Sequence, residues 1–241
     1  MPPLFSLLIC LLVPAISILL GGILARTWTP RKTTIAAVQH FTAGLILSAV
    51  AVELMPDLVA SSKFSAIVIG FALGVGTLLT IAKLTEPTET SGRSKNGSAG
   101  LIAAVAVDLF VDGLLVGTAL TLGARQGLLI ALALTIEAFF LAISTSTALA
   151  CRGAGQGRRF LIIILLSIAV ITGVLVAHFL SRHLSGNLLA GTLAFATAAL
   201  LYLVVEELLV EAHRKEDKAS TPLFFFAGFL LLYILQYALG G

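Results

Sequence analysis

Charged residues are scarce in this chain. Only 11% of its 241 residues are Asp, Glu, Lys or Arg, whereas a soluble domain carries roughly 25%. Hydrophobic residues make up 59%, and the mean hydropathy is +1.08. This composition excludes an ordinary soluble domain, and several runs of about 20 apolar residues predict helices that cross a membrane. The short alternating segments typical of membrane β-barrels are absent.

The sequence also lacks the motifs of catalysis. It contains no Ser–His–Asp arrangement, nucleotide-binding loop or haem motif, so we expect neither an enzyme nor an organic cofactor. The two cysteines, Cys10 and Cys151, have neither a CxxC spacing nor any metal-binding spacing. The net charge of +3 does not indicate nucleic acid as a partner, because the basic residues lie between apolar runs, where membrane topology accounts for them.

We predict an all-α integral membrane protein with eight transmembrane helices in a single domain, residues 1–241. The expected spans are 4–24, 35–56, 64–84, 99–120, 127–150, 160–180, 188–210 and 223–239. Residues 85–98 are rich in Ser, Thr and Gly and predict a flexible cytoplasmic loop between spans one to three (4–84) and spans four to eight (99–239). The first span is longer than a signal-peptide core and follows no basic residue, so we expect it to remain as a helix.

Basic residues are distributed unevenly between the loops. Twelve follow spans one, three, five and seven, and three follow spans two, four and six. The first set is Arg26, Arg31, Lys32, Lys83, Arg93, Lys95, Arg152, Arg158, Arg159, Arg214, Lys215 and Lys218, and the second is Lys63, Arg125 and Arg182. Because cytoplasmic loops are enriched in Lys and Arg, both termini should lie outside an inner or plasma membrane.

Two carboxylates lie one helical turn apart in the fourth span. Asp108 and Asp112 share a helix face, about 6 Å apart along the axis. An ionised carboxylate in hydrocarbon costs at least ~2.5 kcal/mol, and two on one face repel each other. No Lys or Arg accompanies them in the span, so a mobile cation is the natural counter-charge. The alternative is a protonated pair, hydrogen-bonded to a neighbouring helix.

Glu137 adds a third acid from the fifth span. The connection between spans four and five is short, which predicts antiparallel neighbours and places Glu137 at a depth similar to that of Asp112. We therefore predict one cation site built from Asp108, Asp112 and Glu137, which the family resemblance described below would make a metal site. Carboxylates and other polar groups along the remaining spans are candidates for the ion pathway: Glu53, Asp57, Ser144, His178, Glu206 and Glu207.

The second and seventh spans resemble each other. Both end in an acid, an apolar pair, one further residue and a second acid, as in Glu53 to Asp57 and Glu207 to Glu211. The loop charges give these spans opposite directions, and opposite directions are typical of an inverted repeat.

These residues resemble the ZIP family of divalent-metal transporters, and in particular its bacterial GufA-like members. The family signature His-Asn-x-x-Asp-Gly-x-x-x-Gly corresponds to residues 108–117, and 203–212 is similar to the seventh span of the family. Of the span-five motif His-Glu-x-Pro-His-Glu, only Glu137 is retained. Asp108 and Leu109 replace the signature His and Asn, so the resemblance implies one His-poor metal site rather than two.

The resemblance implies import of a divalent cation into the cytoplasm. A site without imidazole or thiolate favours Mn, Fe or Mg over Zn, although any of these metals fits the class. Membrane lipid and the cation are the expected partners, nucleic acid is not, and a homodimer stays open. Two alternatives are a membrane sensor that binds metal without transporting it and a proton-coupled carrier of a small organic cation.

Overall fold

The computed structural model describes residues 3–28, 30–61, 63–85, 97–181, 186–214 and 221–240, and within them it contains helices and no β-strand. The predicted loop 85–98 lies mostly outside the described residues. The helices are α1 (Pro3–Leu24), α2 (Lys32–Ala49), η1 (Val50–Leu54), α3 (Met55–Ala60), α4 (Phe64–Thr85), α5 (Gly97–Leu122), α6 (Ala124–Cys151), α7 (Gln156–Ser181), α8 (Asn187–Tyr202), η2 (Leu203–Leu208), α9 (Leu209–Arg214) and α10 (Pro222–Gly240).

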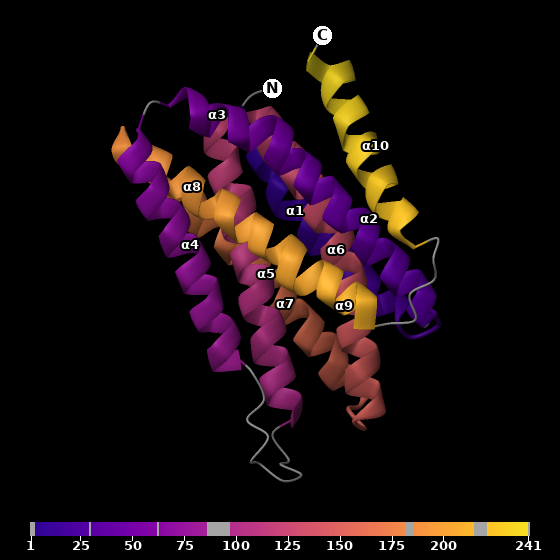
Figure 1. Ribbon diagram of the computed structural model, residues 1–241. Coiled ribbons are helices and arrows are strands. Elements are labelled where there is room, and N and C mark those ends of the chain that lie inside the picture. The colour runs from indigo at the N-terminus through magenta and orange to yellow at the C-terminus, as the bar shows by residue number, and fades with distance from the viewer. Residues whose placement is uncertain are drawn as a thin grey trace.

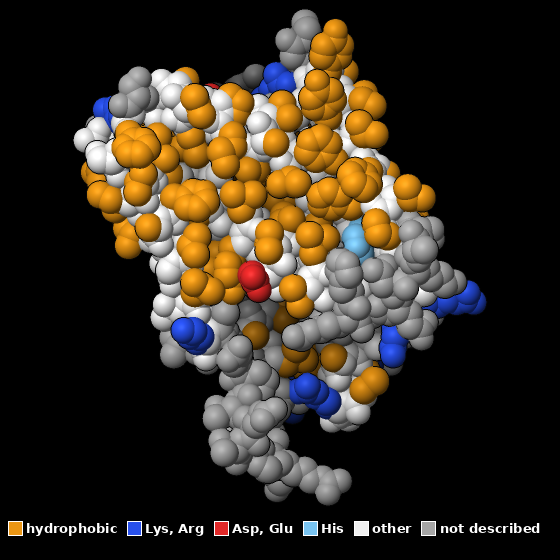
Figure 2. Space-filling model, in the orientation of Figure 1, with side chains coloured by type: hydrophobic (Ala, Val, Ile, Leu, Met, Phe, Trp, Pro, Cys, Tyr) orange, Lys and Arg blue, Asp and Glu red, His pale blue; other side chains and the backbone are white. Residues whose placement is uncertain are grey.

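Six helical segments in the described part are long and apolar enough to cross a membrane. They are Leu4–Leu24, Lys32–Ala60, Leu101–Thr121, Ala124–Cys151, Gln156–Leu180 and Asn187–Glu206, and two shorter apolar stretches are Phe64–Thr80 and Pro222–Ala238. Hydrophobic side chains cover the middle of the face in Figure 2, and Lys and Arg lie toward its upper and lower margins. The exposed apolar residues, such as Leu73, Leu161 and Ile234, are typical of a surface in contact with lipid.

The helices pack in four closely apposed pairs: α1 with α6, α5 with α7, α2 with α10, and α4 with α8 (Figure 1). Further contacts of α1 with α7 and of α5 with α6 join the first two pairs into one group, which we call the acid-bearing group (α1, α5, α6 and α7). The π-containing group comprises α2, α4, α8 and α10 with η1 and η2. The two groups meet chiefly where α2 packs on α6 and where α5 packs on α8.

This pairing has an internal correspondence. In this correspondence α1, α2 and α4 match α7, α8 and α10, and α5 matches α6. The α1–α6 pair then maps onto the α7–α5 pair, and the α2–α10 pair maps onto the α8–α4 pair. An inverted repeat produces this kind of arrangement. The two spans that resemble each other in sequence also share an irregularity, because each is interrupted by a π-helical segment: η1 contains Glu53, and η2 contains Glu206 and Glu207.

The second span was expected to end at Pro56, and the structure differs. The helix continues to Ala60, and Pro56 lies in the first turn of α3, directly after η1. A proline is tolerated in a first turn, because its missing N–H would have no helical partner there. The other span ends differ from the expected ones by only a few residues.

Candidate metal site

Asp108 and Asp112 lie on the continuous helix α5, one turn apart as expected. Asp112 is 2% exposed and Asp108 is half-buried. The helix is uninterrupted from Gly97 to Leu122, so both carboxylates belong to one helix face inside the candidate span Leu101–Thr121. Ionisable side chains at this depth are expensive unless they serve a polar pathway.

Glycines fix the position of this helix against α7. A Cβ atom added to Gly113 would lie 2.3 Å from the carbonyl oxygen of Val170, and one added to Gly117 would lie 2.5 Å from that of Val174. The Gly113–Gly117 pair therefore serves close packing of α5 on α7, as small residues commonly do between membrane helices. This contact fixes the position of α5, and with it the neighbouring Asp112, along the axis of α7.

Glu137 lies on α6, which follows α5 after the single residue Gly123. The two helices pack against each other, which confirms that spans four and five are neighbours. Glu137 is 9% exposed. It lines a cavity of about 190 Å³ formed by Ile35, Val38, Gln39, Thr42, Glu137, Phe140, Leu141, Ser144 and Leu208.

The cavity contains Glu137 and Ser144 of the expected residues, whereas Asp108 and Asp112 do not line it. Among the described side chains, no group of three or more His, Cys, Asp or Glu residues is arranged to hold a metal ion. The side chains of Glu53 and Glu207 lie outside the described part of the structure. The three-carboxylate site on α5 and α6 therefore stays a prediction.

The remaining pathway candidates lie in varied surroundings. Asp57 is exposed in the first turn of α3, and Glu206 is exposed within η2. His178 is half-buried in the last turn of α7, where its ring makes an edge-to-face contact with Phe179 at 5.9 Å between ring centroids.

Sequence reasoning did not single out three polar residues of α2. Gln39 and Thr42 line the same cavity as Glu137, and His40 is 2% exposed, with its Nδ1 atom 2.9 Å from the carbonyl oxygen of Ala36. The structure therefore buries His40 within α2. Gln39 and Thr42 are three residues apart and share a helix face, but neutral polar residues are common in membrane helices, so this spacing by itself does not identify a site.

No family model matches the chain. The zinc transporter GufA of Myxococcus xanthus is 32% identical over 156 residues, which cover 63% of this chain and 60% of that protein. The aligned region thus spans less than two thirds of the relative. This similarity confirms the resemblance to GufA-like transporters that the motifs indicate. With its six long apolar helices, the chain is a multi-pass protein of the cell membrane, similar over much of its length to a zinc transporter.

Proposed function

We propose that this protein transports a divalent metal cation across the cell membrane into the cytoplasm. The proposal depends on one observation: three carboxylates lie on the neighbouring helices α5 and α6, within candidate spans, and Asp112 and Glu137 are at least nine-tenths buried. Paired intramembrane acids of this kind mark ion pathways. The similarity to a zinc transporter supports the same class of substrate.

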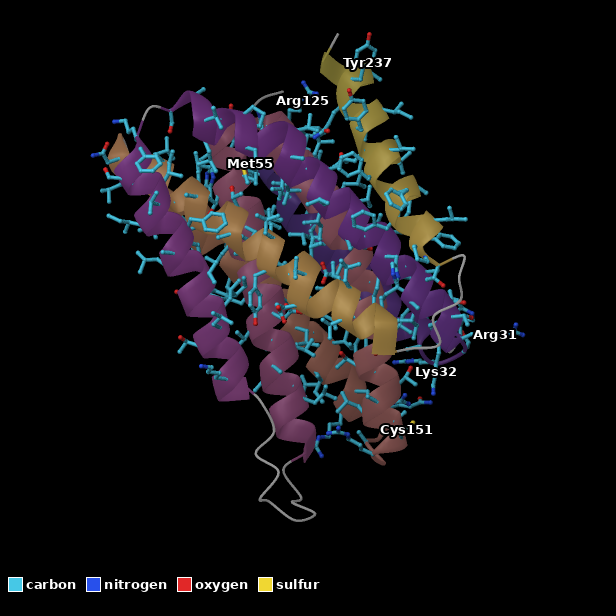
Figure 3. The ribbon with its side chains drawn as sticks, viewed as in Figure 1. Arg31, Lys32, Met55, Arg125, Cys151 and Tyr237 are labelled. Atoms are coloured by element: carbon cyan, nitrogen blue, oxygen red, sulfur yellow. The ribbon has the colours of Figure 1, made fainter. Side chains whose placement is uncertain are left out.

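In the proposed topology, the chain crosses the membrane eight times and both termini lie outside. The α4 and α10 helices, with 22 and 19 residues, extend about 33 and 28 Å at 1.5 Å per residue, close to the ~30 Å hydrocarbon core. Arg31, Lys32 and Cys151 lie toward one end of the bundle, and Arg125 and Tyr237 toward the other (Figure 3). The first end would face the cytoplasm.

Cysteine labelling tests this topology. Cys151 is exposed, whereas Cys10 is buried, so a Cys10→Ala variant leaves one reactive thiol. We expect a membrane-impermeant maleimide to label Cys151 only after the cells are permeabilised. A Cys10→Ala, Cys151→Ala, Lys63→Cys variant should be labelled in intact cells, because Lys63 follows the second span. Labelling of Cys151 in intact cells would contradict the proposed topology and indicate the opposite orientation.

In the proposed pathway, Glu53 and Asp57 attract the ion at the outer mouth, Asp108, Asp112 and Glu137 coordinate it at mid-depth, and Glu206 and Glu207 receive it on the inner side. The π segments support this pathway, since such segments occur frequently at functional sites. Movement of the acid-bearing group against the π-containing group would alternate access to the central site. Oxygen ligands favour Mn, Fe or Mg, and Zn belongs to the same class of divalent substrates.

Flux measurements on purified protein test the function. Proteoliposomes should accumulate Mn(II) or Zn(II) well above protein-free liposomes, and radioactive metal should exchange against unlabelled metal trapped inside. A sensor would bind metal without this counterflow. A carrier of organic cations would show neither metal binding nor metal flux, and either result would overturn the proposal.

A further inference from the structure

A groove with a volume of about 730 Å³ lies between the first halves of α2 and α10. Its lining residues are Thr33, Thr34, Ala37, Val38 and Phe41 of α2, Ile136 of α6, and Thr221, Phe224 and Ala227 at the start of α10. Phe224 is 47% exposed, and both α2 and α10 contain apolar membrane stretches. The groove therefore opens toward the lipid.

Two glycines set the inner end of this groove. A Cβ atom added to Gly44 would overlap the carbonyl oxygen of Phe225, and one added to Gly228 would overlap the carbonyl oxygen of Phe41. At this level α2 and α10 thus touch backbone to backbone. The lining residues of both helices, within 33–41 and 221–227, precede the glycine contact. The groove therefore extends from the contact toward the start of both helices, over about 12 Å along α2.

The polarity of the lining changes along the groove. Ala37, Val38 and Phe41 line the part near the glycine contact, whereas the hydroxyl-bearing residues Thr33 and Thr34 line the part near the start of α2. None of the described residues that line the groove is charged. An apolar channel with hydroxyls at its open end matches a phospholipid, whose acyl chain is apolar and whose headgroup is polar.

Positive charge gathers at the open end. Arg31 and Lys32 are exposed, directly precede Thr33, and lie at this end of the bundle (Figure 3). The positive end of the α2 dipole is at the same place, and Arg31 gives no side-chain hydrogen bond to cap it. Trp28, which is 38% exposed, lies four residues before Lys32, and tryptophan is enriched at the level of lipid headgroups.

We propose that this groove binds an anionic phospholipid of the phosphatidylglycerol type. One acyl chain packs along Ala37, Val38 and Phe41, and the phosphate lies at Arg31 and Lys32. Basic pockets between transmembrane helices bind anionic headgroups by this charge complementarity. The lipid would contact both helix groups, because α6 contributes to the groove together with α2 and α10. The proposal goes beyond metal transport and does not depend on it.

The fluorescence of Trp28 tests the proposal, because it is the only tryptophan of the chain. Its ring lies 6.3 Å from that of Phe140, one turn along α6 from Ile136. The probes are brominated phosphatidylglycerol and brominated phosphatidylcholine, which quench tryptophan on contact, in lipid–detergent mixtures with purified protein. We expect phosphatidylglycerol to bind about 25-fold more tightly, with about fivefold from each basic residue.

The double variant Arg31→Gln, Lys32→Gln should lose this preference. The matched control is Arg152→Gln, Arg158→Gln, which removes the same charge from exposed residues outside the groove and should keep it. Equal binding of the two lipids by the wild type would overturn the proposal. An equal loss in the control would overturn it too, because general surface charge would then account for the preference.

Ala227→Leu tests the groove itself, since it adds volume to the lining and leaves both basic residues in place. The preference for phosphatidylglycerol should fall, and an unchanged preference would overturn the acyl-chain position. Displacement of the lipid by soluble glycerol phosphate would show a phosphate site and overturn the lipid assignment. The four charged residues are exposed, so their substitution should preserve the fold, and they decide the proposal even if Ala227→Leu does not fold.

Discussion

Replacing Asp112 by asparagine is expected to reduce metal uptake at least about 100-fold. Mutating groups that only support a metal ligand commonly costs 10–100-fold in affinity or activity, so removal of a charged ligand should cost no less. Asp112 is 2% exposed, and bulk water therefore cannot replace the lost carboxylate oxygen. The measurement is initial uptake of Mn(II) and Zn(II) by proteoliposomes at matched protein content.

Stability distinguishes a binding role from a structural one. A buried carboxylate is costly in a membrane interior, so Asp112→Asn should leave the melting temperature unchanged or raise it if the acid serves the ion. Asp217→Asn removes the same charge from the loop between the last two expected spans and should transport normally. Full uptake by Asp112→Asn, or a large loss of stability with it, would favour the alternative of a protonated structural acid.

Replacing Gly173 by alanine is expected to destabilise the protein by about 1–3 kcal/mol, as overpacking does. A Cβ atom at this position would lie 2.2 Å from the carbonyl oxygen of Phe110 and 2.9 Å from the Cα atom of Gly113. Both neighbours are backbone atoms, so α5 and α7 would have to separate. The measurement is the melting temperature of purified protein in detergent.

Gly76→Ala is the matched control, because an added Cβ atom there meets nothing within 4 Å. Alanine in place of an interior helical glycine should stabilise by about 0.5–1 kcal/mol. Opposite signs for the two substitutions would show that backbone contact, rather than helix propensity, sets the cost at Gly173. Equal melting temperatures would contradict the close packing of α5 on α7.

Hydropathy and charge predicted the helices well, since lipid imposes a simple requirement on length and polarity. The same pattern contains no information on hydrogen-bond register, so η1 and η2 were not expected and Pro56 was taken as a span end. The resemblance between the second and seventh spans was visible in their acids, but the shared π segments appear only in the structure.

The acids on α5 and α6 could be identified from the sequence because charges in apolar runs are conspicuous. Gln39 and Thr42 could not, since single neutral polar residues are common in membrane helices. Their place in the cavity beside Glu137 depends on the packing of α2 against α6, and Glu137 is nearly a hundred residues away along the chain. Long-range packing of this kind leaves no local pattern.

The π segments also change how the second and seventh spans should be drawn on a helical wheel. Each π turn accommodates one surplus residue relative to an α-helix, and one residue corresponds to about 100° of rotation. A wheel drawn continuously through 32–60 would therefore assign Asp57 to the wrong side of its helix. Cysteine-scanning or crosslinking libraries for these spans need two wheels each, with the phase reset at Leu54 and at Leu208.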